Sequence, residues 1–90
     1  MAETLELTET TRDEVGGVGV GVGNILDDDD FELPGGATGH GLTARLHTED
    51  GGRIVVGKGS VFALGDGEWE VLEIVSGGDD DFGTVTLQRV

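Results

Sequence analysis

A chain of 90 residues with no cysteine has room for one small domain, whose stability must come from packing alone. Its net charge of −14, from nineteen acidic and five basic residues, argues against direct binding to nucleic acid or to an anionic membrane, because both require a cationic surface. The N-terminal segment has no basic region followed by an apolar one, and no apolar run approaches the ~18 residues that cross a bilayer. We therefore expect a cytoplasmic protein with a single domain over residues 1–90.

The acidic residues gather toward the two ends of the chain. Residues 1–34 hold ten acids and one base, residues 35–64 two acids and three bases, and residues 65–90 seven acids and one base. One lysine beside runs such as LDDDDFE gives a composition that looks like that of salt-accumulating halophiles. Two interpretations of the acidity stay open: adaptation to a salty cytoplasm, and a surface shaped for one basic partner.

Alternating apolar and polar residues, interrupted by glycine every few positions, predict strands and little or no helix. In TLELTETT, Leu5 and Leu7 are expected to face the core. In VGVGVG, residues 18–23, the valines are expected to line one face of a strand and the glycines the other. The bare glycine face permits tight curvature, or lets a large ring such as Trp69 or Phe62 lie on the backbone.

Two glycine-containing patterns resemble nucleotide-binding loops without satisfying their requirements. Residues 16–23 offer no frame with glycines at i, i+2 and i+5, and no helix is expected after them. GRIVVGKGS places Gly59 where a P-loop requires serine or threonine, and its RIVV is a strand pattern. Neither segment is interpreted as a phosphate-binding loop.

The segment LDDDDFELPGGATGHG, rich in aspartate and glycine, predicts a long loop at about 27–41. Long loops carry binding functions more often than the elements that they connect. The acidic first half of this loop is the candidate partner-binding site, which consists of Asp27, Asp28, Asp29, Asp30, Phe31 and Glu32.

The next two strand patterns, LTARLHT and RIVV, are joined by EDGG and predict a hairpin. Pairing Leu46 with Ile54 makes one face wholly apolar, and the same register pairs Ala44 with Val56. The other face of this hairpin carries Arg45, His47 and Arg53. These residues could form internal ion pairs with neighbouring acidic strands. Alternatively, they form a candidate anion patch.

A second hairpin is predicted in VFALGDGEWEV. A two-residue turn at 66–67, Asp-Gly, is expected to pair Leu64 with Trp69 and Phe62 with Val71. This register places the large side chains on one face of the hairpin.

The strand EWEVLEIV carries apolar side chains on both faces. It is therefore expected to be central in the structure, or to contain a bulge that turns its second half inward. The closing strand TVTLQRV is expected to pair with it through Val85–Ile74, Leu87–Leu72 and Arg89–Glu70.

These elements predict an all-β fold with six or seven short antiparallel strands. Two architectures fit a chain of this size: a small barrel of SH3-like size, or a compact sandwich. The segment RIVVGKGSVFALGDGEWEVLEIV followed by GTVTLQRV resembles the C-terminal half of small all-β proteins of unknown function from actinobacteria. The resemblance implies a β-rich fold and carries no function with it.

No metal site, cofactor or catalytic centre is expected. The aspartate runs at 27–30 and 79–81 lack the alternation, central glycine and distal glutamate of an EF-hand. His40 and His47 are separated by an odd number of positions, which places them on opposite faces of a strand. The serines show neither a nucleophile elbow nor a paired base, so we do not expect an enzyme.

The favoured hypothesis is a non-catalytic protein-binding domain, of inhibitor, immunity or adaptor type, that engages a basic partner surface. The second hypothesis is a small-ligand or cation-binding barrel that uses the loop carboxylates or the candidate anion patch. The third is a halophile-type protein whose acidity is only solvent adaptation. The sequence leaves the oligomeric state open.

Overall fold

The computed structural model describes residues 3–9, 12–15, 17–65, 67–77 and 82–90, without the side chains of Asn24 and Asp28. The described part contains eight strands and one short 3₁₀ turn, η1 (Pro34–Gly36). The strands are β1 (Thr4–Thr8), β2 (Arg12–Val15), β3 (Val18–Glu32), β4 (Thr38–Thr48), β5 (Arg53–Gly57), β6 (Val61–Leu64), β7 (Gly67–Val75) and β8 (Thr84–Arg89). The predicted all-β class is confirmed, with eight strands instead of six or seven.

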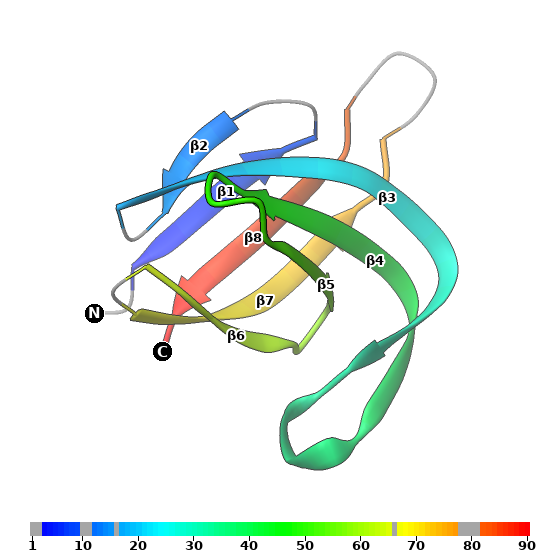
Figure 1. Ribbon diagram of the computed structural model, residues 1–90. Helices are drawn as coiled ribbons and strands as arrows, with labels where there is room; N and C mark the ends of the chain where they lie inside the picture. The colour runs from blue at the N-terminus through cyan, green and yellow to red at the C-terminus, as the bar shows by residue number, and fades with distance from the viewer. Residues whose placement is uncertain (1–2, 10–11, 16, 66, 78–81) are drawn as a thin grey trace.

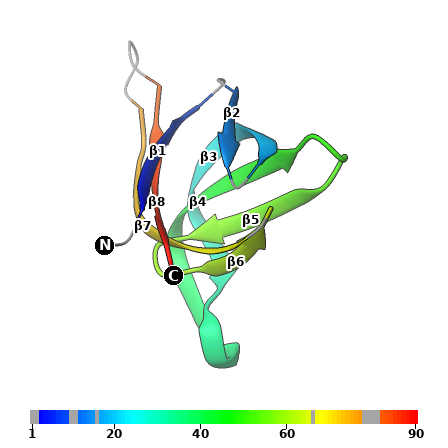
Figure 2. The same ribbon diagram turned by 90° about the vertical axis from the view of Figure 1, so that its left-hand side faces the viewer.

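The strands form two four-stranded antiparallel sheets (Figure 1). Sheet A has the order β1-β8-β7-β6, and sheet B has the order β2-β3-β4-β5. Figure 2 shows β1, β8 and β7 nearly edge on, with sheet B beside them. The described strands therefore form two sheets and not one closed barrel. No helix in the described ranges is long and apolar enough to cross a membrane.

The core lies between the two sheets and is supplied by alternating positions of both. Leu5 and Val18, which were predicted to face the core, are partly buried and pack against it. The buried members of the core are Leu7, Val15, Val20, Val22, Ala44, Leu46, Val56, Phe62, Leu64, Trp69, Val71, Ile74, Val85 and Leu87.

The predicted register of the β4–β5 hairpin is confirmed. Leu46 lies opposite Ile54, and Ala44 lies opposite Val56. In this register Leu46 and Ala44 are fully buried. A shift by one residue would turn these side chains to solvent and bring charged ones inward, which explains why this register is selected.

The predicted register of the β6–β7 hairpin is wrong by two residues. Phe62 lies opposite Trp69, and Leu64 lies opposite Gly67, so positions 65–66 connect the strands. Asp66, part of the turn expected at 66–67, lies outside the described residues. A shift of two residues keeps every side chain on its face, so alternation alone could not choose between the registers. Gly65 has a φ of 64°, a conformation that glycine adopts readily in tight hairpin turns.

Strand β7 is central in sheet A and also contains the expected bulge. Its register with β8 shifts between Val71 and Glu73, which leaves Leu72 as the extra residue. The predicted pair of Val85 with Ile74 is confirmed because it lies beyond the bulge. The other two predicted pairs are wrong, because before the bulge Leu87 lies opposite Val71 and Arg89 opposite Trp69.

The segment at 27–41 is mostly strand, and the prediction of a long loop there is wrong. Strand β3 continues to Glu32, and β4 begins at Thr38, so a short connection around η1 joins them. Residues 29–32 pair in register with residues 38–41. The aspartate run thus lies in a twisted hairpin with two register shifts in β3, and its far end projects from the body of the molecule (Figure 1).

Candidate binding surfaces

Asp29, one of the predicted partner-binding residues, is held within the protein. Its Oδ2 accepts a hydrogen bond from Thr43 Oγ1 at 3.2 Å and lies 3.4 Å from Arg45 Nη2. Thr43 is fully buried, and the side chain of Arg45 is 25% exposed, with its Nη1 buried. The carboxylate of Asp29, whose side chain is 37% exposed, therefore already binds polar groups of β4.

Phe31 is likewise structural, because its side chain is 9% exposed. Its ring lies on the backbone of Gly39 and Gly57, where an added Cβ would overlap the ring. The next residue, Glu32, accepts a hydrogen bond through its carbonyl from Ser60 Oγ at 2.9 Å. The end of β3 is thus fastened to the turn between β5 and β6.

The other acidic residues of the predicted site lie on the β3–β4 hairpin. Asp27, Asp30 and Glu32 are exposed. Asp30 Oδ1 lies 2.7 Å from His40 Nδ1 across the hairpin. The side chain of Asp28 lies outside the described part of the structure. The structure therefore leaves exposed carboxylates on the hairpin, while Asp29 and Phe31 of the predicted site make internal contacts.

The predicted grouping of Arg45, His47 and Arg53 on one sheet face is confirmed. Arg53 lies directly opposite His47, and Arg45 lies one position along the same face, opposite Val55. The row extends across the sheet, because His47 lies opposite Gly21 and Gly21 lies opposite Arg12. We call Arg12, Arg45, His47 and Arg53 the cationic band.

Arg12 was not among the residues expected on this face. The signal that could have found it is the pairing of RDEV with VGVG across a short turn, which places Arg12 and Gly21 on the outer face once Val15 and Val20 face inward. Directly opposed residues of antiparallel strands project to the same side of the sheet. Three of the protein's four arginines therefore share one face.

Gly23 and Gly19 of β3 accommodate the side chains of His47, in β4, and Glu49, just after β4, and not an aromatic ring, which was one of the two expected uses of the glycine face. Trp69 and Phe62 are buried in the core. The imidazole of His47 lies over Gly23, with Nε2 2.7 Å from the position of an added Cβ, and Glu49 lies over Gly19. The small side of β3 thus sets where His47 sits on the outer face.

Internal ion pairing, the alternative role for these cations, applies to Arg45, which pairs with Asp29. Its Nη1 is buried and has no hydrogen-bond partner in the described structure. Within the described ranges, the exposed side chains of Arg12, His47 and Arg53 have neither an ion pair nor a hydrogen bond. The band therefore retains donors that the protein itself does not use.

The outer face of sheet A has the opposite charge. Glu6 lies opposite Thr86, which lies opposite Glu73, and Glu70 lies between Gln88 and Val61 in the next row. Arg89 is on the other side of the sheet, 5.9 Å from the ring centroid of Trp69. Among its described residues this outer face carries no lysine, arginine or histidine, and we call its carboxylates the acidic face: Glu6, Glu68, Glu70 and Glu73.

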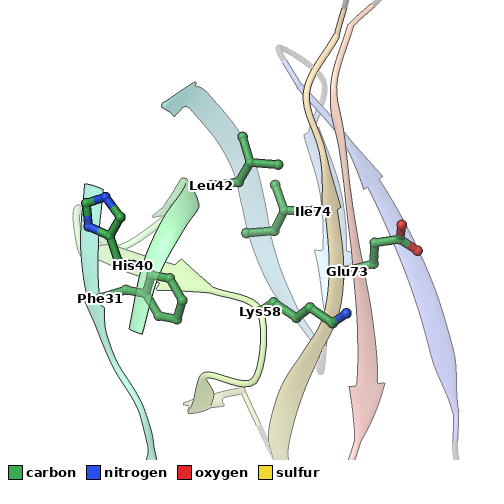
Figure 3. Close-up of a pocket in the computed structure, with 6 residues that line it drawn as sticks. All are labelled: Phe31, His40, Leu42, Lys58, Glu73 and Ile74. Atoms are coloured by element: carbon green, nitrogen blue, oxygen red, sulfur yellow. The ribbon is translucent and has the colours of Figure 1, made fainter. Parts of the chain in front are cut away.

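A pocket of about 290 Å³ opens between the β3–β4 hairpin and β7. Figure 3 shows Leu42 and Ile74 close together, with Phe31 and His40 on the hairpin side. Lys58 reaches across from the turn between β5 and β6, while Glu73 points away toward the acidic face. The volume of this pocket is at the small end of the range for ligand sites. Part of its lining is Phe31, whose ring already packs on the backbone of Gly39 and Gly57.

No group of three or more histidine, cysteine, aspartate or glutamate residues in the described ranges is arranged to hold a metal ion. The aspartate run at 79–81 lies outside those ranges. Comparisons of this chain with protein-family models, with curated proteins and with solved structures gave no match. The resemblance to small actinobacterial proteins stays a prediction.

Proposed function

We propose that the chain is a non-catalytic protein-binding domain that engages a basic partner through the acidic face. The observation that carries the proposal is the set of four glutamates on the outer face of sheet A, whose described residues include no basic side chain. Uncompensated carboxylates on one face create a local negative potential, which speeds encounter with a basic surface and selects its orientation.

The arrangement of the acidic face suits contact with an extended surface. Glu6 and Glu73 are separated by one intervening strand, so their backbones are about 10 Å apart. Threonine and glutamine side chains between the glutamates offer hydrogen-bonding groups without charge. Val61 and Val75, 39% and 48% exposed, add apolar contact area on the same face.

The exposed carboxylates of the hairpin are the competing location for the same function. Asp27, Asp30 and Glu32 are exposed, whereas their neighbours Asp29 and Phe31 make internal contacts. A partner at the hairpin would meet carboxylates beside the imidazole of His40, while a partner at sheet A would meet a face whose described residues include no basic side chain.

The test compares two double variants that remove the same charge. The probe is a poly-L-lysine of about 20 residues, titrated calorimetrically at low and at high KCl, because charge-driven binding weakens with salt. Glu6→Gln with Glu73→Gln should weaken binding by about fivefold or more, whereas Asp27→Asn with Glu32→Gln should change it by less than about twofold.

Any other result contradicts the assignment of the binding site to the acidic face. A larger loss in the hairpin variant would move the binding site to residues 27–32. Equal losses in both variants would show that the probe senses only net charge, and the proposed site would be withdrawn. The single tryptophan provides a check that each variant remains folded.

A further inference from the structure

We propose that the cationic band is a second binding site, on sheet B, for a short ligand that carries several phosphate groups. The proposal does not depend on the function assigned to the acidic face. It begins from the row that crosses all four strands of sheet B in register, from Arg12 through Gly21 and His47 to Arg53.

The row has the length of a ligand with more than one anionic group. Neighbouring strands are about 4.8 Å apart, so the backbones of Arg12 and Arg53 are separated by roughly 14 Å. Gly21, between Arg12 and His47, has no side chain to occupy the surface between them. A single phosphate would meet only one or two of these side chains, whereas a chain of phosphates can meet all of them.

Guanidinium groups match phosphate oxygens well, because their planar fork donates two parallel hydrogen bonds. Arg12 and Arg53 are exposed and have no ion pair among the described residues, so neither must break an internal contact to bind. Arg45 lies in the adjoining row and pairs with Asp29, and its Nη1 is buried, so Arg12, His47 and Arg53 supply the proposed contacts.

The surroundings of the band limit the ligand to a short one. The neighbouring row carries Glu14 opposite Gly19, and the side chain of Glu49 also lies over Gly19. A long polyanion such as nucleic acid would extend beyond the row onto these carboxylates and onto a protein of net charge −14. A short polyphosphate group fits the row without doing so.

The probe for the test is sodium tripolyphosphate, compared with orthophosphate and with NaCl at matched ionic strength. We expect saturable binding by calorimetry, with amide shifts centred on Gly21, His47 and Arg53 in a two-dimensional NMR titration. Orthophosphate should bind about tenfold more weakly, because it meets fewer cations.

Three single variants remove one positive charge each. Arg12→Gln and Arg53→Gln should each weaken tripolyphosphate binding by about tenfold. Lys58→Gln is the matched control, since Lys58 is exposed in the turn between β5 and β6, outside the band, and this change should have less than about a twofold effect.

Absence of saturable binding, or an equal loss in the Lys58 variant, would overturn the site. Orthophosphate binding as tightly as tripolyphosphate would overturn the assignment of a ligand with several phosphates. The Arg53→Gln variant should leave poly-L-lysine binding intact, and the Glu6→Gln with Glu73→Gln variant should leave tripolyphosphate binding intact. These two controls distinguish a wrong assignment of the phosphate site from a wrong assignment of the protein-binding function.

Discussion

The ring of Phe31 on β3 lies against the backbone of Gly57 on β5 so closely that position 57 has no space for a side chain. The same turn is fastened by Ser60, whose Oγ accepts a hydrogen bond from Gly57 N–H at 3.0 Å and donates one to the Glu32 carbonyl at 2.9 Å. These contacts hold the end of the β3–β4 hairpin on the turn between β5 and β6.

Gly57→Ala should lower the free energy of unfolding by about 1–3 kcal/mol, because the added methyl group displaces the Phe31 ring. Urea denaturation followed by the fluorescence of Trp69 measures the change. In a Phe31→Leu background the same substitution should cost less, because the smaller side chain leaves room. An equal cost in both backgrounds would show that the ring contact is not the cause.

Glu9 joins the two sheets through its side chain. Its Oε1 accepts a hydrogen bond from Gly83 N–H at 3.1 Å, and its Oε2 accepts one from Ile25 N–H at 3.2 Å. Glu9→Ala leaves two partly buried donors without these acceptors, so stability should fall by about 1–3 kcal/mol and hydrogen exchange at both amides should accelerate.

Glu6→Ala is the matched control for Glu9, because Glu6 projects to solvent from the preceding strand. Its effect on stability should stay within about 0.5 kcal/mol. If the two alanine variants unfold at the same urea concentration, the carboxylate of Glu9 does not stabilise the contact between the sheets.

Asp50, in the turn between β4 and β5, should titrate at lower pH than an ordinary aspartate. Hydrogen bonds from the Thr48 hydroxyl, the larger effect, and from the Gly52 N–H lower the pKa of its carboxyl below 3.8. The carboxylate therefore stabilises the turn fully above that pH, and the contribution is lost as the pH falls through the lower folded-state value. Carbon-13 NMR of the carboxyl group measures the pKa directly.

Thr48→Val should raise the pKa of Asp50 toward 3.8, because it removes the larger of the two causes. Thr86→Val, on the outer face of sheet A, should leave that pKa unchanged. A pKa that does not respond to Thr48→Val would assign the shift to the backbone of the turn alone.

The thermal unfolding midpoint in a KCl series separates the two interpretations of the acidity. A surface shaped for a partner predicts that the domain is folded at low salt, with a modest rise of the midpoint as salt screens the net charge of −14. A requirement for molar KCl would instead favour solvent adaptation. CaCl2 at matched ionic strength should add no further shift, and a large shift at micromolar calcium would identify a metal site.

The all-β class, the inward valines of β3, the register of the β4–β5 hairpin and the bulge in β7 could be predicted from the sequence. These features follow from local alternation, because a strand with one buried face has its side chains sorted by a period of two. Arg45, His47 and Arg53 came together for the same reason, since they share a hairpin with a fully apolar opposite face.

The tertiary structure alone decided which segments distant in sequence lie side by side. It also decided the registers between which alternation cannot choose. The β6–β7 register differs from the prediction by two residues, which reverses no face. The pairing of β8 before the bulge differs by one residue, because the position of the bulge decides which residues of β7 lie opposite Leu87 and Arg89. The tertiary structure also brought Arg12 into the cationic band and aligned Glu6 with Glu73 across β8. Alternation sorts residues within a strand, but the order of strands in a sheet depends on which apolar faces pack together in three dimensions.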